Sequence, residues 1–119
     1  MHLYMVEKLV DDIMLLDLRG RITLGEETEA LRGRIRQLVE AGYTRIILNL
    51  ADVNYSDSVG LSTLVASYTS ARKRGGNMKL LHLTTRVHDL LQITRLSTVF
   101  EIFDDPGEAQ RSFGSPPAP

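Results

Sequence analysis

The fold is decided by the stretch RIILNLADVNYSDSVGL, residues 45–61. Its first part, residues 45–50, is almost continuously apolar, which is typical of a strand buried on both faces of a parallel sheet. A short connection at 51–56 follows. Asp57 or Ser58 then begins a helix, because both residue types are preferred at helix N-caps. Gly60 in the first turn costs about 1 kcal/mol relative to alanine, which is tolerable where another group approaches the backbone closely.

Upstream of this stretch the pattern predicts a hairpin and a helix. Strands are expected at 3–10 and at 13–18, joined by an acidic turn, and the second strand ends at Gly20. The helix follows and ends at Gly42. Its apolar stripe recurs in steps of three and four residues. The stripe consists of Leu24, Thr28, Leu31, Ile35, Leu38 and Val39.

Downstream the alternation continues. The helix that begins at Asp57 or Ser58 ends after three basic residues at Gly75 and Gly76, which is a strong C-terminal signature. A strand at 78–83, a helix around 87–94 and a short strand at 100–103 come next, and 105–111 forms a final helical turn or two. His82 is placed within the strand at 78–83, where it is expected to be packed or hydrogen-bonded.

The resulting order, β-β-α-β-α-β-α-β, predicts a single-domain α/β fold with a mixed four- to five-stranded sheet and helices packed on it. The domain is expected to span residues 1–111, and 112–119 to form a disordered proline-rich tail. Functional residues of such sheets lie beyond the carboxyl ends of the parallel strands. Three loops therefore define the search area: 19–25, 51–58 and 83–86.

The composition disfavours several classes of partner and of chemical site. Fourteen basic and fifteen acidic residues give a net charge of −1, which disfavours nucleic acid and anionic membrane surfaces as partners. The chain has no cysteine, and its three histidines lack the spacing of metal ligands. No signal peptide or membrane-spanning run is visible, so we expect a soluble cytoplasmic protein without direct membrane insertion.

Signatures of catalysis are missing as well. The sequence contains no nucleophile elbow, no phosphate loop and no dinucleotide fingerprint, so we predict no catalytic residues, no metal and no cofactor. A small hydrolase that uses Ser58 and a histidine stays open as an alternative. The Asp57-Ser58 pair is explained by capping alone, but it also lies at the predicted functional edge. A phosphoryl group on Ser58 would add about −1.5 to −2 charges there.

The chain resembles a STAS domain over roughly residues 4–110, and specifically the stand-alone bacterial anti-sigma factor antagonists. The similarity is carried by residues 48–61, the helix that follows, the Gly75-Gly76 stop and residues 80–83. The segments 20–22 and 90–96 add to it. The sequence departs from the family pattern at Thr23 and Asn49, where aspartate is frequent.

The resemblance implies partner switching in the regulation of transcription. The protein would bind an anti-sigma factor that is also a serine kinase, and so release a sigma factor. Phosphorylation of Ser58 would end the binding, and a metal-dependent serine phosphatase would reset the protein. ATP would belong to the kinase, and the protein would be a monomer or a weak homodimer. The implied partner-binding residues are Arg21, Thr23, Asp57, Ser58, Val59, Gly60 and Thr63.

Two alternatives remain at this point. Ser56 supplies a second hydroxyl close to Ser58 and is a possible decoy or alternative acceptor. The chain could also be the STAS subunit of a lipid-transport ATPase complex. In that case the same surface would dock a membrane permease without phosphorylation.

Overall fold

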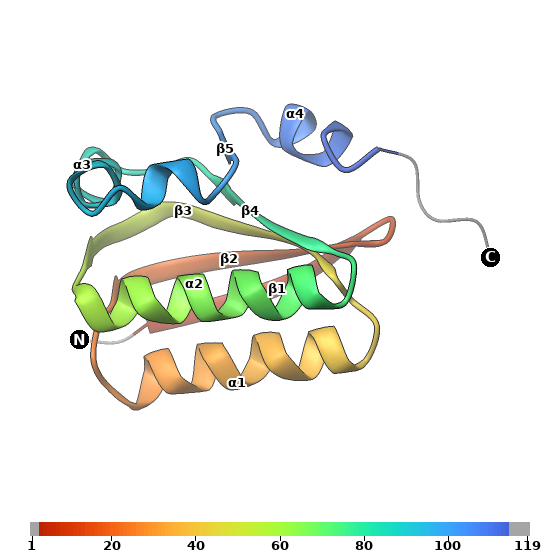
Figure 1. Cartoon of the computed structure of the whole chain (residues 1–119), viewed down its shortest axis with the longest axis horizontal. Coiled ribbons are helices and arrows are strands. Elements are labelled where there is room, and N and C mark those ends of the chain that lie inside the picture. Colours follow the sequence, from red (N-terminus) through yellow and green to blue (C-terminus); the bar gives the residue numbers. More distant parts are fainter. Residues whose placement is uncertain (1–2, 115–119) are drawn as a thin grey trace.

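The computed structural model describes residues 3–114 and contains one sheet in the strand order β1-β2-β3-β4-β5 (Figure 1). The first two strands are antiparallel, and the remaining neighbours are parallel. The predicted mixed α/β sheet is therefore confirmed. The strands are β1 Leu3–Val10, β2 Ile13–Ile22, β3 Arg45–Ser56, β4 Asn77–Leu81 and β5 Ile102–Phe103.

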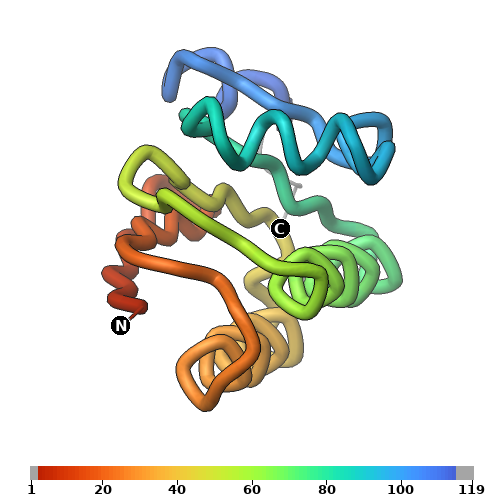
Figure 2. The backbone as a smooth tube through the Cα atoms, turned by 90° about the vertical axis from the view of Figure 1, so that its left-hand side faces the viewer, coloured from red at the N-terminus to blue at the C-terminus, as the bar shows by residue number. Residues whose placement is uncertain are grey.

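Helices cover both faces of the sheet. Helices α1 and α2 run side by side on one face, and α3 and α4 lie on the other (Figures 1 and 2). A short 3-10 turn, Leu96–Thr98, follows α3. None of these helices combines the length and apolar character that a bilayer crossing needs. The helices are α1 Glu26–Glu40, α2 Ser58–Lys73, α3 Thr85–Ile93 and α4 Pro106–Arg111.

Alternate residues of β3 enter two different parts of the core. Ile46 and Leu48 belong to the larger cluster, which includes residues of α1, α2 and α3, whereas Ile47 joins a smaller cluster with Ala109 of α4. Both sides of the strand are therefore removed from water. This double burial is the physical reason for the unbroken apolar run from which the parallel strand was predicted.

Two strands are longer than their apolar patterns indicated. β2 was expected to end at Gly20 but continues to Ile22, and the loop predicted at 51–56 is the second half of β3. These halves pair with each other, from Arg19 opposite Asp52 to Ile22 opposite Ser56. One register irregularity precedes this span, between Asp17 and Arg19, and a second lies within it, between Gly20 and Arg21. Backbone hydrogen bonds extend the ladder past Leu50, where the continuous apolar run of β3 ends and exposed polar residues such as Asp52 and Asn54 interrupt it. In contrast, β4 and β5 are shorter than predicted, and His82 lies just past the end of β4 with φ of 57°.

The predicted helices are confirmed, but two residues next to helices lie elsewhere than expected. Leu24 matches the period of the α1 stripe, but it lies before the helix and is 74% exposed. Phe113, which was assigned to the tail, packs against the smaller cluster, and the hydroxyl of Ser112 accepts a 2.7 Å hydrogen bond from Lys79. The proposed tail beyond Gly114 lies outside the described residues.

Candidate functional site

The end of β2 and the beginning of α2 are joined by hydrogen bonds at the carboxyl edge of the sheet. Ser56 Oγ donates to the carbonyl of Ile22 at 2.7 Å, and the backbone N–H of Asp57 donates to the same carbonyl at 3.4 Å. From the other side, the N–H of Leu24 donates to Asp57 Oδ2 at 3.0 Å. The β2–α1 connection and the α2 N-terminus therefore form one surface.

Asp57 is the N-cap of α2, and the structure thereby decides between Asp57 and Ser58, which the sequence left open. Its Oδ1 accepts a 2.8 Å hydrogen bond from the N–H of Gly60, while Oδ2 holds Leu24. These backbone donors, chiefly Leu24, keep the pKa of the Asp57 carboxyl below its usual range. A fixed negative charge therefore stands beside Ser58 at neutral pH.

Gly60 is required by the packing of this junction. A Cβ at Gly60 would lie 1.7 Å from the carbonyl oxygen of Ile22 and 2.6 Å from Ser56 Oγ. The close approach predicted from the sequence is present, and the approaching group is the end of β2. Gly60 and Thr63 are both buried, Thr63 with 3% of its surface exposed. Two of the partner-binding residues that the resemblance implied are therefore buried in the free protein.

Ser58 is exposed in the first turn of α2. Its backbone carbonyl accepts a 2.9 Å hydrogen bond from Ser62 Oγ, whereas its own hydroxyl has no hydrogen-bond partner in residues 3–114. Ser56 is the opposite case, because it is 1% exposed and its hydroxyl is bound to the end of β2. The alternative acceptor Ser56 is therefore inaccessible to another protein in the folded chain.

The remaining predicted contacts lie around Ser58 on two sides. Val59 is exposed beside it, and Thr23 is half-buried in the β2–α1 connection. Arg21 is exposed on the α3 side of the sheet edge, with its guanidinium 5.7 Å from the centre of the Tyr55 ring. Arg86 of α3 covers the same ring at 5.2 Å.

The model of the STAS domain family matches residues 4–109, nearly the whole described chain. The chain belongs to the STAS domain family. Among curated relatives, the anti-sigma-B factor antagonist of Bacillus subtilis is 36% identical over 72 residues, which cover 60% of this chain and 65% of that protein. That of Listeria monocytogenes is 38% identical over 61 residues, covering 51% and 54%. The match thus spans less than two thirds of either relative.

Solved structures agree with this STAS assignment. A crystal structure from Thermotoga maritima, of a protein named as a candidate anti-sigma factor antagonist, has a TM-score of 0.86 and 26% identity over 93% of this chain and 95% of that one. The anti-sigma factor antagonist SpoIIAA in its unphosphorylated form has a TM-score of 0.72 over 94% and 100% of the two chains. At 17% identity, the second likeness shows the fold alone.

The sequence analysis included Val59 in this STAS surface but missed Leu24, its more exposed apolar residue. Leu24 is 74% exposed and Val59 is 37% exposed, and the two residues flank the Asp57 cap. A groove of about 420 Å³ begins at Ser58 and runs between α2 and the segment after α3, lined by Leu61, Val65 and Leu96 among others. No sequence signal separates Leu24 from the buried stripe of α1, because its spacing to Thr28 fits that stripe.

Support for the hydrolase alternative is lacking in this geometry. His82 and His88 make no hydrogen bond with Ser58, and the only ion-pair contact of His88 within residues 3–114 is with Asp89 at 3.8 Å. Within the same residues, no cluster of three or more His, Cys, Asp or Glu side chains is arranged to hold a metal ion.

Proposed function

We propose that this STAS protein is an anti-sigma factor antagonist controlled by phosphorylation of Ser58. It binds an anti-sigma factor that is also a serine kinase and so releases a sigma factor. Phosphorylation ends the binding, and a serine phosphatase restores it. The names of the relatives support this role, and one structural observation carries the choice of site: Ser58 is exposed at a helix N-terminus with a free hydroxyl.

The contact surface we propose is the sheet edge around Ser58. Leu24 and Val59 supply exposed apolar area, which a partner can bury with a gain of about 25 cal/mol per Å². Arg21 and Thr23 lie at its border, and Asp57 holds the two segments together through its carboxylate. The protein performs no reaction of its own in this scheme and acts in the cytoplasm.

Electrostatics explains why phosphorylation would break the complex. The phosphoryl group adds about −1.5 to −2 charges next to the ionised Asp57. In the free protein, water and the N-terminus of α2 stabilise this charge. In a complex, the same charge would have to be desolvated beside the apolar side chains of Leu24 and Val59, which is unfavourable.

The test compares three variants for binding to the purified cognate anti-sigma factor by calorimetry. Ser58→Ala should bind as the unmodified protein does, and Ser58→Asp should bind at least about tenfold more weakly, equal to about 1.4 kcal/mol. Ser62→Asp, one turn further along α2 and exposed, is the control for added charge and should have a smaller effect. Intact-mass measurement with kinase and ATP should show one added phosphate in the unmodified protein and none in Ser58→Ala.

Equal affinities of Ser58→Ala and Ser58→Asp would contradict the switch. If Ser58 also stayed unmodified and the protein co-purified with a membrane permease, the lipid-transport alternative would replace this proposal.

A further inference from the structure

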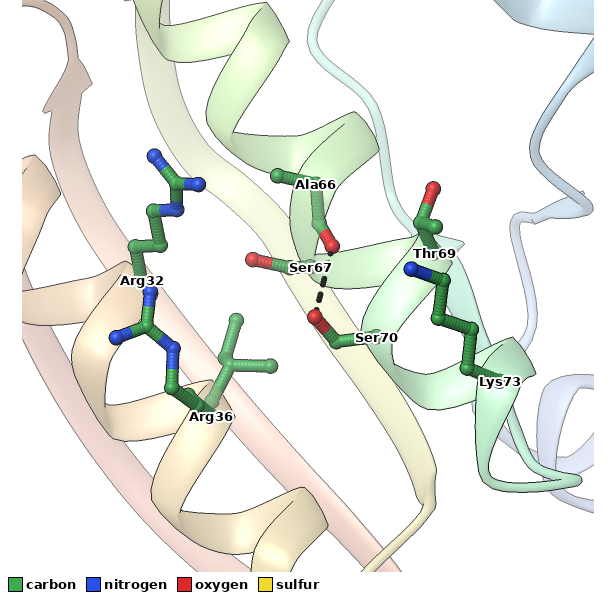
Figure 3. Close-up of a pocket in the computed structure, with 8 residues that line it drawn as sticks. Arg32, Arg36, Ala66, Ser67, Thr69, Ser70 and Lys73 are labelled. Carbon is green, nitrogen blue, oxygen red and sulfur yellow. Dashed lines mark hydrogen bonds between the residues drawn. The ribbon is translucent and has the colours of Figure 1, made fainter.

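A second polar feature lies along the C-terminal half of α2, on the side that faces α1. The two helices enclose a cleft of about 280 Å³ (Figure 3). Arg32 and Arg36 line it from α1, one helical turn apart, and Ser67, Ser70 and Lys73 line it from α2. In Figure 3 the Lys73 side chain runs along α2 toward Thr69. With a rise of about 1.5 Å per residue, Ser67 lies roughly 13 Å along the helix from Ser58. The cleft is therefore separate from the proposed partner surface.

The cleft is positively charged and uncompensated. Its three cationic side chains form no ion pair with any of the described residues, and no Asp or Glu is among the residues that line it. Lys73 lies in the last turn of α2, where the helix dipole favours a cation. Arg32 and Arg36 lie in the interior of α1, where the dipole gives no such reason.

Ser67 provides the independent observation. Ser67 is 2% exposed, and its Oγ has no hydrogen-bond partner among residues 3–114. The hydroxyl points toward α1 and into the space beside the two arginines (Figure 3). Ser70 differs, because its hydroxyl donates to the carbonyl of Ala66 at 3.1 Å. A buried hydroxyl without a partner is destabilising, so its retention here is explained if a ligand accepts its hydrogen bond.

We propose that this cleft binds the phosphate group of a small soluble ligand. Two guanidinium groups offer paired donors that match phosphate oxygens, and Lys73 adds a third charge. The Ser67 hydroxyl supplies a buried donor that fixes the orientation of the bound group. The volume admits a phosphate group with a small organic part and is too small for a folded partner.

The test is a titration of the whole protein with inorganic pyrophosphate at constant ionic strength, followed by amide chemical shifts. The largest changes should map to the cleft, at Arg32, Arg36, Ser67 and Ser70. Arg36→Gln should weaken binding by about tenfold. Ser67→Ala should weaken it by about fivefold without lowering the melting temperature, because the hydroxyl has no partner to lose in the described part of the chain.

Lys8→Gln is the matched control for loss of one positive charge. Lys8 is exposed on β1 and lies on the opposite side of that strand from Glu7, which pairs with Arg34 of α1. This variant should bind pyrophosphate within about twofold of the unmodified protein. The Ser58 variants should also bind it normally, so this site and the partner switch can fail independently.

Three results would overturn the proposal. One is an equal loss of affinity in Lys8→Gln and Arg36→Gln, which would indicate general charge attraction. Another is unchanged pyrophosphate binding by Ser67→Ala. The third is binding to vesicles that contain phosphatidic acid without any binding of pyrophosphate.

Discussion

Serine hydroxyls near the start of α2 differ in burial and hydrogen bonding from the serine hydroxyl in its C-terminal half. At the N-terminal end, the buried Ser56 is hydrogen-bonded to Ile22, and Ser58 is exposed with its hydroxyl free. In the C-terminal half, Ser67 is buried, and its hydroxyl has no partner within the part of the chain that the structure describes. Burial and hydrogen bonding, taken together, therefore distinguish a serine that stabilises the fold from one that is available to another molecule.

The sign of the local charge also differs between the N-terminus of α2 and its C-terminal half. The N-terminal end carries the ionised Asp57, so an added phosphoryl group there increases a negative charge that is already present. The cleft beside the C-terminal half gathers Arg32, Arg36 and Lys73. Near the N-terminus of α2, a phosphoryl group on Ser58 would thus oppose binding of the partner protein. In the cleft beside the C-terminal half of α2, a phosphate group would itself be bound.

The largest effect is expected at the tight junction of the N-terminal end. Gly60→Ala should lower the free energy of unfolding by at least about 3 kcal/mol, because the new methyl group would overlap the carbonyl of Ile22. Gly33→Ala is the matched control, since Gly33 lies within α1 and a methyl group added there would meet nothing within 4 Å. It should stabilise the protein by about 0.5–1 kcal/mol. Urea denaturation measures both, and similar values would show that the junction is not tight.

A smaller effect should separate the serines. Ser56→Ala should cost about 1.5 kcal/mol of unfolding free energy, because it removes a buried hydrogen bond. Ser58→Ala and Ser67→Ala should change stability by no more than about 0.5 kcal/mol, since neither hydroxyl has a hydrogen-bond partner among the described residues. Thermal unfolding of the three variants compares them directly. If Ser67→Ala lost as much unfolding free energy as Ser56→Ala, Ser67 would also stabilise the fold. The two serines would then not differ in role.

The smallest effect concerns the cap and depends on pH. The pKa of Asp57 is lower in the folded protein than usual, so its ionised form contributes stability above about pH 3.9, the ordinary aspartate value. That contribution is lost as the pH falls through the folded pKa. Asp57→Asn keeps a good cap without the charge and should be about 0.5 kcal/mol less stable at pH 7. Urea titrations at several pH values measure this difference in unfolding free energy between the unmodified protein and Asp57→Asn. It should vanish once the pH is below the folded pKa of Asp57.

Asp104→Asn, at an exposed position near α4, is the charge control for this comparison and should leave stability at pH 7 nearly unchanged. A difference between the unmodified protein and Asp57→Asn that stayed constant down to pH 2 would contradict the role given to the ionised cap.

Local signals predicted the elements well and their ends less well. The stripe from Thr28 to Val39 was predicted correctly, and the cap of α2 was narrowed to Asp57 or Ser58. Burial of one helix face and satisfaction of the first N–H groups both leave marks in neighbouring residues. The second half of β3 was missed, because it is held by ladder hydrogen bonds to β2 that do not depend on side-chain type. Leu24 was misplaced for the related reason that period alone cannot show where a helix begins.

Within the site, the sequence selected Asp57 and Ser58 but could not sort their neighbours. Thr63 and Gly60 were assigned to the contact surface and are buried, while the exposed Leu24 was assigned to the core. The cleft with Arg32 and Ser67 left no sequence motif, since its residues come from two helices that are adjacent only after folding. Such a juxtaposition is decided by helix packing on the sheet.

The sequence by itself determined the alternation of strands and helices, the near-neutral charge and the capped serine at the start of α2. These properties follow from local hydrogen bonding and from hydrophobic periods that are carried by adjacent residues. Only the tertiary structure decided which serine is exposed, why Gly60 must be glycine and where the cationic cleft lies. Each of these depends on contacts between segments far apart in the chain, as when the carbonyl of Ile22 meets Ser56 and Gly60 across the β2–α2 junction.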